Sequence, residues 1–340
     1  MKTNPKVAVV ILNWNGQALL AQFLPALMAS PYPNLEIVLG DNASTDTSVD
    51  FVQQHYSQIR IIQNEENYGF AGGYNRILNQ VEADYFVLLN SDVEVKGDWI
   101  SPLISLMENN PAIAAAQPKI LSYGDKNSFE YAGAAGGFID YLGYPFCRGR
   151  IFDTLEQDHG QYNQASEIFW ASGAALFIRR TAWLEAGGFD EDFFAHMEEI
   201  DLCWRLKQLG HQVWYCPEAS VYHVGGGTLS AESPRKTFLN FRNNLLMINK
   251  NHDAITAFFK VLIRFFMDFL SLLKFITDGK PKNAAAISKA HVDFLKNCRS
   301  NAKKRVKEKI VFNAKGIYPK SIVWQYFISK KKYFSELKPF

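Results

Sequence analysis

The sequence predicts an α/β fold with a Rossmann-like, mostly parallel sheet and helices on both faces. In the N-terminal part, short apolar runs alternate with segments of helical periodicity, the order typical of a parallel sheet with covered faces. The apolar runs are almost unbroken, as in "VVIL" and "YFVLL", so we expect strands buried on both sides. The strands are expected at residues 6–15, 34–44, 59–70 and 84–92, with helices at 17–30, 44–56 and 72–81.

The regular alternation stops after residue 111. Residues 169–180 and 212–224 are expected to form further strands, and residues 198–210 a helix. From residue 236 or so the chain is predicted to be helical and then basic. We therefore expect a globular unit, residues 1–250, followed by a helical basic extension, residues 251–340.

Composition and charge narrow the class of protein. A chain of 340 residues that is 48% hydrophobic can bury a large core. Its four cysteines show no C-x-x-C pair, which argues against a zinc ribbon or disulfide scaffold and favours a reducing compartment. The N-terminal apolar run is too short for a signal peptide, so we expect a cytoplasmic protein. Residues 254–340 carry 19 Lys and Arg against 5 Asp and Glu, whereas residues 1–253 carry 17 against 29, which indicates two separate roles.

The turn after the first strand excludes two common nucleotide sites. It reads "NWNGQA", without the G-x-G-x-x-G that a dinucleotide-binding fold needs, so a dehydrogenase is disfavoured. The sequence also lacks the G-x-x-x-x-G-K-[ST] of a P-loop. A phosphate-bearing ligand would then need another source of positive charge, most simply a divalent metal.

Polar side chains follow each of the expected strands. In a parallel sheet, ligands bind beyond the carboxyl ends of the strands, so we expect these side chains to share one site. Asp92 can supply an oxygen ligand for Mg²⁺ or Mn²⁺, although Asn90-Ser91-Asp92 could also be an ordinary Asx turn. The polar residues at the strand ends are Asn13, Asn15, Asp41, Asn42, Asn67, Asn90 and Asp92.

A second group of candidates lies further along the chain. Glu198, Glu199 and Asp201 follow the aromatic-rich segment "EDFFAHM", where a partly desolvated carboxylate could act as a general base. Acids at the start of a helix also complement its dipole, which is the alternative interpretation. His223, in "VYHVGGGT", ends a strand and is either a metal ligand or a structural histidine.

These features occur in an order that resembles glycosyltransferase family 2, the inverting nucleotide-sugar transferases of the GT-A fold, and most closely its rhamnosyltransferase-like bacterial members. The resemblance covers roughly residues 6–250. It rests on "VVILNWNG", "DNASTD", "NYGFAGGYN", "LLNSDVEV", "GGFDEDFFAHMEEIDLCWR", "HVGGGT" and "FRNNLL".

The resemblance implies a role for each candidate. Asp41 would bind the nucleotide base, with Asn13 and Asn15 at the same end of the pocket. Asp92 and His223 would hold Mn²⁺ or Mg²⁺ against the diphosphate. The loop that closes on the nucleotide would contain Asn67, Gly69 and Asn75.

Two positions depart from the family pattern. Asn90 stands where an acid is usual, which leaves its contact with the ribose open. Glu199 matches the catalytic base although Asp is usual there, so Glu198 or Asp201 could be the base instead.

The implied function is transfer of a sugar, with inversion, to a glycan or polyprenyl-linked acceptor in the synthesis of a cell-surface polysaccharide. A deoxythymidine diphosphate sugar, dTDP-rhamnose, is the favoured donor by resemblance. The departures at Asn90 and Glu199 keep open a catalytically inactive module that binds nucleotide-sugar or carbohydrate.

Residues 254–277 are expected to form an amphipathic helix on a membrane surface. The polar residues Lys260, Arg264, Asp268 and Lys274 fall on one stripe. We expect Phe258, Phe265, Phe269 and Leu272 to enter the acyl chains while Lys260, Arg264 and Lys274 face headgroups. Packing of this helix on the globular unit is the alternative.

Basic runs at residues 303–309 and 330–332 would add attraction to anionic lipid. Nucleic acid is not an expected partner, because no stacking platform or RNA-binding motif accompanies these charges. The sequence therefore predicts a cytoplasmic enzyme that is peripheral on the inner face of the cell membrane.

Overall fold

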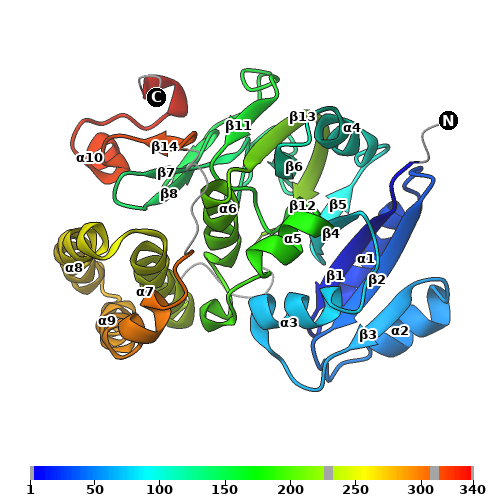
Figure 1. Ribbon diagram of the computed structural model, residues 1–340, viewed down its shortest axis with the longest axis horizontal. Helices are drawn as coiled ribbons and strands as arrows, with labels where there is room; N and C mark the ends of the chain where they lie inside the picture. The colour runs from blue at the N-terminus through cyan, green and yellow to red at the C-terminus, as the bar shows by residue number, and fades with distance from the viewer. Residues whose placement is uncertain (1–3, 226–232, 307–313, 338–340) are drawn as a thin grey trace.

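The computed structural model describes residues 4–225, 233–306 and 314–337. A nine-stranded sheet runs through these residues in the order β11-β13-β6-β12-β4-β1-β2-β3, with β5 paired to β13 (Figure 1). The expected parallel part is present and consists of β1 (Val7–Asn13), β2 (Leu35–Asp41), β3 (Arg60–Gln63) and β4 (Tyr85–Asn90).

The other half of the sheet is mixed. β12 (Ala175–Arg179) is antiparallel to β4 and to β6 (Ile113–Ser122). β13 (Gln212–His223) runs parallel to β6, while β5 (Val93–Val95) and β11 (Ser166–Ile168) are antiparallel to β13. The sheet is thus parallel where the first strands were expected and mixed beyond them.

Helices cover both faces, which confirms the predicted layers. Residues of β1 alternate between two cores: Val7 and Val9 pack in one, Ala8 and Val10 in the other. Burial on both faces explains the unbroken apolar run of this strand. One face is covered by α1 (Gln17–Met28), α2 (Ser48–His55) and α4 (Ser101–Asn109), and the other by α3 (Gly69–Leu78), α5 (Arg180–Ala186) and α6 (Glu198–Gln208).

The sequence did not predict β6 or a second, small sheet. The small sheet has the order β10-β9-β8-β7-β14, and its last strand comes from far along the chain. Its strands have only two to four residues, too few for a periodicity to show. They are β7 (Gly137–Asp140), β8 (Pro145–Cys147), β9 (Arg150–Ile151), β10 (Thr154–Leu155) and β14 (Ile317–Tyr318).

The C-terminal part is helical, as expected, but it is not a detached tail. Lys304 forms ion pairs with Asp190 and Asp192, and Ile322 N donates to Asp140 Oδ2 at 2.9 Å. The boundary at residue 250 stays a prediction, and these contacts lie across or beyond it. The helices are α7 (Pro234–Asn251), α8 (Ala254–Thr277), α9 (Pro281–Ala302) and α10 (Ile322–Phe327), and α7, α8 and α9 gather at the end of the molecule opposite β1 to β3 (Figure 1).

The expectation for α8 was wrong at Arg264 and Phe265, whereas Phe258, Phe269 and Lys274 are exposed as expected. Arg264 is buried rather than directed at headgroups, because it contacts Tyr144 and Asp268 inside the protein. Phe265 stacks on His291 of α9, with ring centroids 4.3 Å apart, so its side chain faces the protein and not lipid. Of the basic run at 303–309, residues 307–309 lie outside the described residues. No helix in the described parts of the chain has the length and hydropathy needed to cross a membrane.

Candidate functional site

The ends of β1 and β2 bring Asn13 and Asp41 together. The two residues are partners in the parallel register, and both are buried. Asn13 Nδ2 donates to Asp41 Oδ1 at 3.1 Å, to Ser44 Oγ at 3.0 Å and to Ser48 Oγ at 2.9 Å. Asp41 Oδ2 accepts from the backbone N–H of Ser44 at 3.0 Å. The carboxylate is therefore held in one orientation at the strand end.

The turn after β1 passes close over this pair. Asn15 has a left-handed backbone, and its Oδ1 accepts from the backbone N–H groups of Thr45 at 2.7 Å and Asp46 at 3.2 Å. A Cβ added at Gly16 would lie 2.5 Å from Asn13 Oδ1 and 3.7 Å from Ser91 Oγ. The distance to Ser91 is an ordinary contact, but a side chain at Gly16 would force Asn13 to move, so a glycine suits this turn. The structure brings Asn13, Asn15 and Asp41 into one cluster.

The loop before α3 is tied to the same region by Asn42. Asn67 Oδ1 accepts from Asn42 Nδ2 and from Gly69 N, both at 2.9 Å. Gly69 has a φ of 70°, and a Cβ there would lie 2.6 Å from the carbonyl oxygen of Phe194. Asn67 and Gly69 thus connect the strand ends to the segment that precedes Glu198.

Asn75 lies in α3 and contacts the segment that precedes the acids. Its amide exchanges two hydrogen bonds of 2.9 Å with the backbone of Phe189 and donates to Glu191 Oε1 at 3.2 Å. Because both ends of the amide are used in this way, Asn75 fixes the segment before the acids, and its assignment to the nucleotide loop stays a prediction.

The pairing of β5 with β13 places Asp92 beside His223. His223 is the register partner of Val93, and Val224 N donates to the backbone oxygen of Asp92 at 3.0 Å. His223 Nε2 lies 3.1 Å from Asp92 Oδ1 and 3.4 Å from Asn90 Nδ2. Asn90, Asp92 and His223 therefore form the second cluster, next to the first, since Asn90 is also the β4 partner of Leu12 in β1.

A residue that the sequence did not indicate completes this cluster. Glu130 is buried, and its Oε2 lies 3.2 Å from His223 Nδ1. Burial lowers the pKa of His223, but the adjacent carboxylates of Asp92 and Glu130 together outweigh burial and raise it to about 10. Burial raises the pKa of Asp92, but the hydrogen bond and charge of His223 together with backbone N–H groups offset this, so that the pKa is lowered.

The donor set fits a divalent metal that a ligand helps to hold. A carboxylate and an imidazole side by side are suitable for Mn²⁺ or Mg²⁺, and a carboxylate behind the histidine is the usual support of a metal-bound ring. Within the described ranges, no group of three or more His, Cys, Asp or Glu could hold a metal. Asp92 and His223 would thus supply part of the coordination, and phosphate oxygens and water the rest.

The acids at the start of α6 are presented by a strained segment. Phe194, His196 and Met197 all have positive φ, a conformation that costs energy in residues other than glycine. Asn243 Nδ2 compensates by donating to the backbone oxygens of Phe193, Ala195 and His196 at 2.9, 2.9 and 2.7 Å. Asn243, in the "FRNNLL" motif, is therefore a positioning residue for the acids.

The three acids have different environments. Asp201 is fully buried and binds Arg205 at 2.9 Å, Lys250 at 2.8 Å and Asn251 at 2.8 Å. These partners engage both of its oxygens, so Asp201 is a structural ion-pair residue, and its assignment as a possible base is withdrawn.

Glu198 and Glu199 each have a carboxylate oxygen, Oε2, with no hydrogen-bond partner in the described parts of the chain. Burial raises the pKa of Glu199 to about 7, although backbone N–H groups at the start of α6 lower it. Burial, followed by the charge of Glu199, raises the pKa of Glu198 well above its usual value. Glu198 is only 4% exposed, whereas Glu199 is partly exposed and lies next to Gly173, so Glu199 is the better placed of the two to meet a substrate.

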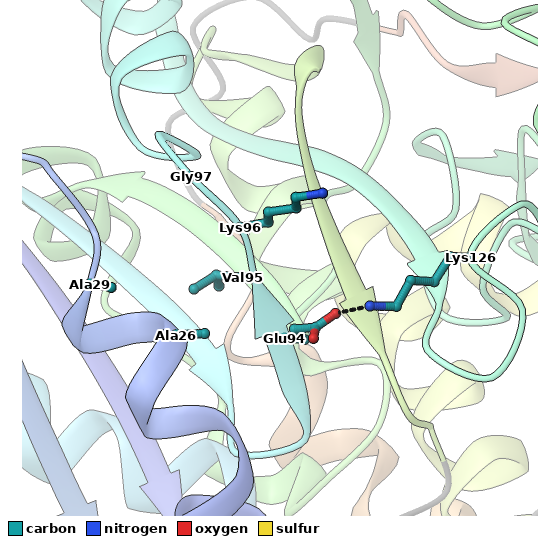
Figure 2. A pocket seen from close by; sticks show the side chains of 7 residues that line it. All are labelled: Ala26, Ala29, Glu94, Val95, Lys96, Gly97 and Lys126. Carbon is teal, nitrogen blue, oxygen red and sulfur yellow. Dashed lines mark hydrogen bonds and ion pairs between the residues drawn. The ribbon is translucent and has the colours of Figure 1, made fainter.

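A surface hollow of about 380 Å³ lies elsewhere, between α1 and β5 (Figure 2). Its lining includes Ala26, Val95 and the ion pair of Glu94 with Lys126. None of the residues discussed above lines it, so the hollow is separate from the candidate site.

Comparison with known proteins identifies the sequence relatives. The pattern of glycosyl transferase family 2 matches residues 8–179. The N-acetylglucosaminyl-diphospho-decaprenol L-rhamnosyltransferase of Mycobacterium tuberculosis strain H37Rv is 28% identical over 233 residues, covering 63% of this chain and 75% of the relative. The O-antigen biosynthesis protein RfbC of Myxococcus xanthus is 24% identical over 240 residues, covering 68% of this chain and 18% of the relative.

Solved structures show the fold. GalNAc-T7 with UDP, GalNAc and Mn²⁺ superposes with a TM-score of 0.57 at 16% identity, covering 74% of this chain and 48% of that one. The mannosyltransferase PcManGT of Pyrobaculum calidifontis, in complex with GDP-Man and Mn²⁺, has a TM-score of 0.52 at 15% identity, with coverages of 89% and 84%. The expected GT-A fold is thereby confirmed. Because the matched pattern runs from β1 through β12 and contains Asp41, Asn90 and Asp92, the chain belongs to glycosyltransferase family 2.

Proposed function

We propose that the protein is a metal-dependent, inverting glycosyltransferase that takes its sugar from a nucleoside diphosphate. The observation that supports this most strongly is the Glu130–His223–Asp92 arrangement next to the Asn13–Asp41 cluster. It supplies a partial metal site for a diphosphate beside a buried, oriented carboxylate suited to a nucleotide. Family membership supports the same conclusion.

In this proposal each group has one task. Asp41, Asn13 and Asn15 bind the nucleotide, with Asn67, Gly69 and Asn90 near it, and Asp92 and His223 hold Mn²⁺ or Mg²⁺. The metal, when bound, offsets the negative charge that grows on the leaving diphosphate. Glu199 removes the proton from the acceptor hydroxyl as that oxygen attacks the anomeric carbon from the side opposite the nucleotide. A single displacement of this kind inverts the configuration.

The inactive binding module remains the alternative. It is favoured by Asn90 and Glu199, which stand where other acids are usual. The raised pKa of Glu199, about 7, favours an enzyme, because such a carboxylate can accept and release a proton near neutral pH. Its Oε2 has no hydrogen-bond partner among the described residues, so none of them competes for a proton there.

The donor and acceptor are proposed from the relatives. The mycobacterial relative is named as a rhamnosyltransferase acting on an N-acetylglucosaminyl-diphospho-decaprenol, so we favour dTDP-rhamnose and a polyprenyl-linked glycan. The product would belong to a cell-surface polysaccharide. The protein would work in the cytoplasm, at the inner face of the membrane that holds such an acceptor.

Binding of nucleoside diphosphates tests this proposal. We expect dTDP to raise the melting temperature of the protein in the presence of Mn²⁺ or Mg²⁺ and much less in EDTA, and to do so more than UDP or GDP. Transfer from dTDP-rhamnose to a lipid-linked N-acetylglucosamine acceptor should follow. The absence of metal-stimulated binding for all three diphosphates would overturn the function, whereas binding without any transfer or donor hydrolysis would favour the inactive module.

A further inference from the structure

Helix α8 packs on the protein through its charged stripe. Arg264 is 2% exposed, and its guanidinium lies 3.6 Å from the centroid of the Tyr144 ring. It also forms an ion pair with Asp268, which in turn lies 3.0 Å from His291 Nε2. The polar side of α8 is therefore fixed against α9 and the turn between β7 and β8.

The opposite side of α8 consists of large apolar residues that face outward. At 100° per residue these side chains span about 140° of arc and run the length of the helix. Their exposed fractions lie between 43% and 72%. They are Ile255, Phe258, Phe259, Leu262, Ile263, Phe266, Phe269, Leu270, Leu273 and Ile276. We call these residues the outer face of α8.

The outer face is large for a protein surface. Taking roughly 200 Å² for a large apolar side chain, its exposed area is on the order of 1,000 Å². The largest apolar patch on a typical soluble monomer is about 300–600 Å², and larger patches mark interaction sites. The usual arrangement of a surface helix is the reverse, with the apolar side against the core. We therefore expect this face to bind a partner.

The charges around the outer face identify the occupant. Among the described residues from 253 onward, the exposed acids are Asp253, which caps the start of α8, Asp278, which pairs with Lys274, and Glu336. A second copy of the chain would bring two basic surfaces together, whereas anionic lipid would complement them. The exposed basic residues in the same part are Lys274, Lys282, Lys289, Lys296, Arg299, Lys303, Lys304, Lys315, Lys320, Lys330 and Lys332.

A second apolar group lies at the same end of the molecule. Trp324 and Phe327 of α10, followed by Ile328, are 59%, 44% and 59% exposed. Figure 1 shows α8, the turn between β7 and β8, and α10 along one side of the molecule. Lys260 of α8 contacts the backbone oxygen of Tyr141, which lies in that turn. The helices α8 and α10 therefore lie on the same side of the molecule (Figure 1).

We propose that the outer face of α8 inserts into the surface of an anionic lipid bilayer, with the helix lying in the membrane plane. Arg264 and Asp268 remain in the protein and join the inserted helix rigidly to the globular unit. This membrane binding rests on the proposed function. A polyprenyl-linked acceptor stays in the membrane, so an enzyme that uses it must be held at the membrane surface.

Vesicle flotation with the full-length protein tests the proposal. Vesicles of phosphatidylcholine alone should bind weakly, and vesicles with added phosphatidylglycerol strongly, with binding that falls in high salt. The double variant Phe258→Ser, Phe266→Ser should reduce vesicle binding about tenfold or more. Each substitution removes on the order of 100 Å² of apolar side-chain area from contact with lipid. Leu184→Ser is the matched control: Leu184 is 53% exposed on α5, outside α8, and its loss should change nothing.

Each outcome separates the possible occupants. If the full-length protein ignores anionic vesicles at low salt, the proposal is wrong. If it is a dimer that the double variant converts to a monomer, without vesicle binding, a second copy covers the face instead. Binding of dTDP and metal by each variant in the absence of vesicles serves as the folding control. If the full-length protein binds dTDP and metal but not anionic vesicles, this proposal fails and the proposed function stands. If it binds vesicles but not dTDP with metal, the proposed function fails instead.

Discussion

Glu130 lies behind His223, with its Oε2 3.2 Å from the ring Nδ1, while the opposite ring nitrogen is 3.1 Å from Asp92. Pairing of β13 with β5 and β6 creates this relationship, because it joins segments that are more than ninety residues apart. A carboxylate in this position selects the tautomer of the ring and increases its basicity toward a metal.

Glu130→Gln should therefore weaken the metal affinity of the site by about 10- to 100-fold, the usual effect of removing such a partner. Titration of Mn²⁺ into the protein with saturating dTDP, followed by calorimetry, measures this directly. Glu94→Gln is the control, because Glu94 pairs with Lys126 beside the hollow in Figure 2 and should have no effect. A change of less than twofold in Glu130→Gln would show that the contact does not support the metal.

Asp92→Asn should abolish the metal-stimulated part of dTDP binding, because it removes the anionic ligand while keeping the shape of the side chain. The weak binding that remains in EDTA should be unchanged, since Asn13, Asn15 and Asp41 are untouched. Dissociation constants with and without Mn²⁺ give both quantities. Metal stimulation at wild-type strength in this variant would refute the assignment of Asp92.

Glu199→Gln should leave donor affinity near the wild-type value and reduce transfer by about 10²- to 10⁴-fold, the usual contribution of a general base. Glu198→Gln is the matched comparison, since both acids are at the start of α6 and only Glu199 is partly exposed. Should Glu198→Gln show the larger loss of transfer, the roles of the two neighbours are reversed.

The sequence predicted the parallel strands and the first site cluster because both depend on local pattern. Asn13 and Asp41 follow apolar runs, and the parallel register brings such strand ends together without further information. Glu130 could not be found in this way. It lies in an irregular segment with no motif, and only its approach to β13 gives it a role.

Helix α8 shows a second limit of prediction from sequence periodicity. Its periodicity predicted a polar stripe and an apolar face, and both are present. The pattern does not say which side turns inward, and we expected the charges to face outward. The inward orientation depends on Tyr144 and His291, which bind Arg264 and Asp268 from distant parts of the chain.

Asp201→Asn should destabilise the protein rather than impair the chemical step. Replacing the carboxylate leaves Arg205 without an anionic partner in a buried place and leaves Lys250 with Asp190 alone, so we expect a loss of about 3 kcal/mol, the lower end of the range for a broken buried pair. Urea unfolding measures the loss, and transfer per folded molecule should remain near the wild-type value. Asp98→Asn, at an exposed position, should change stability by about 0.5 kcal/mol or less.

The pH dependence of the transfer rate should report the ionisation of the Glu199 carboxyl group. A general base must be ionised, and the pKa of Glu199 is raised by burial to about 7. Transfer at saturating donor should therefore increase as the pH rises toward 7 and level off above it. The rate is measured from pH 5 to 9 at constant ionic strength, and Glu199→Gln should lose this rise together with most of the rate. A wild-type rate that is already maximal at pH 5 would contradict the assignment.

The same carboxyl group should make stability depend on pH in the opposite direction. Its usual pKa is 4.5 and its folded pKa is about 7, so between these values the folded protein holds a proton that the unfolded chain releases. Stability therefore decreases as the pH rises through this window. The stabilising contribution of the neutral carboxyl is complete below pH 4.5 and lost above pH 7.

Glu199→Gln cannot release that proton, so its stability should exceed that of the wild type at pH 8 by more than at pH 4.5. Urea unfolding of both proteins at the two pH values measures this difference, and an equal gap at both would show that Glu199 ionises as readily in the folded protein as in the unfolded chain.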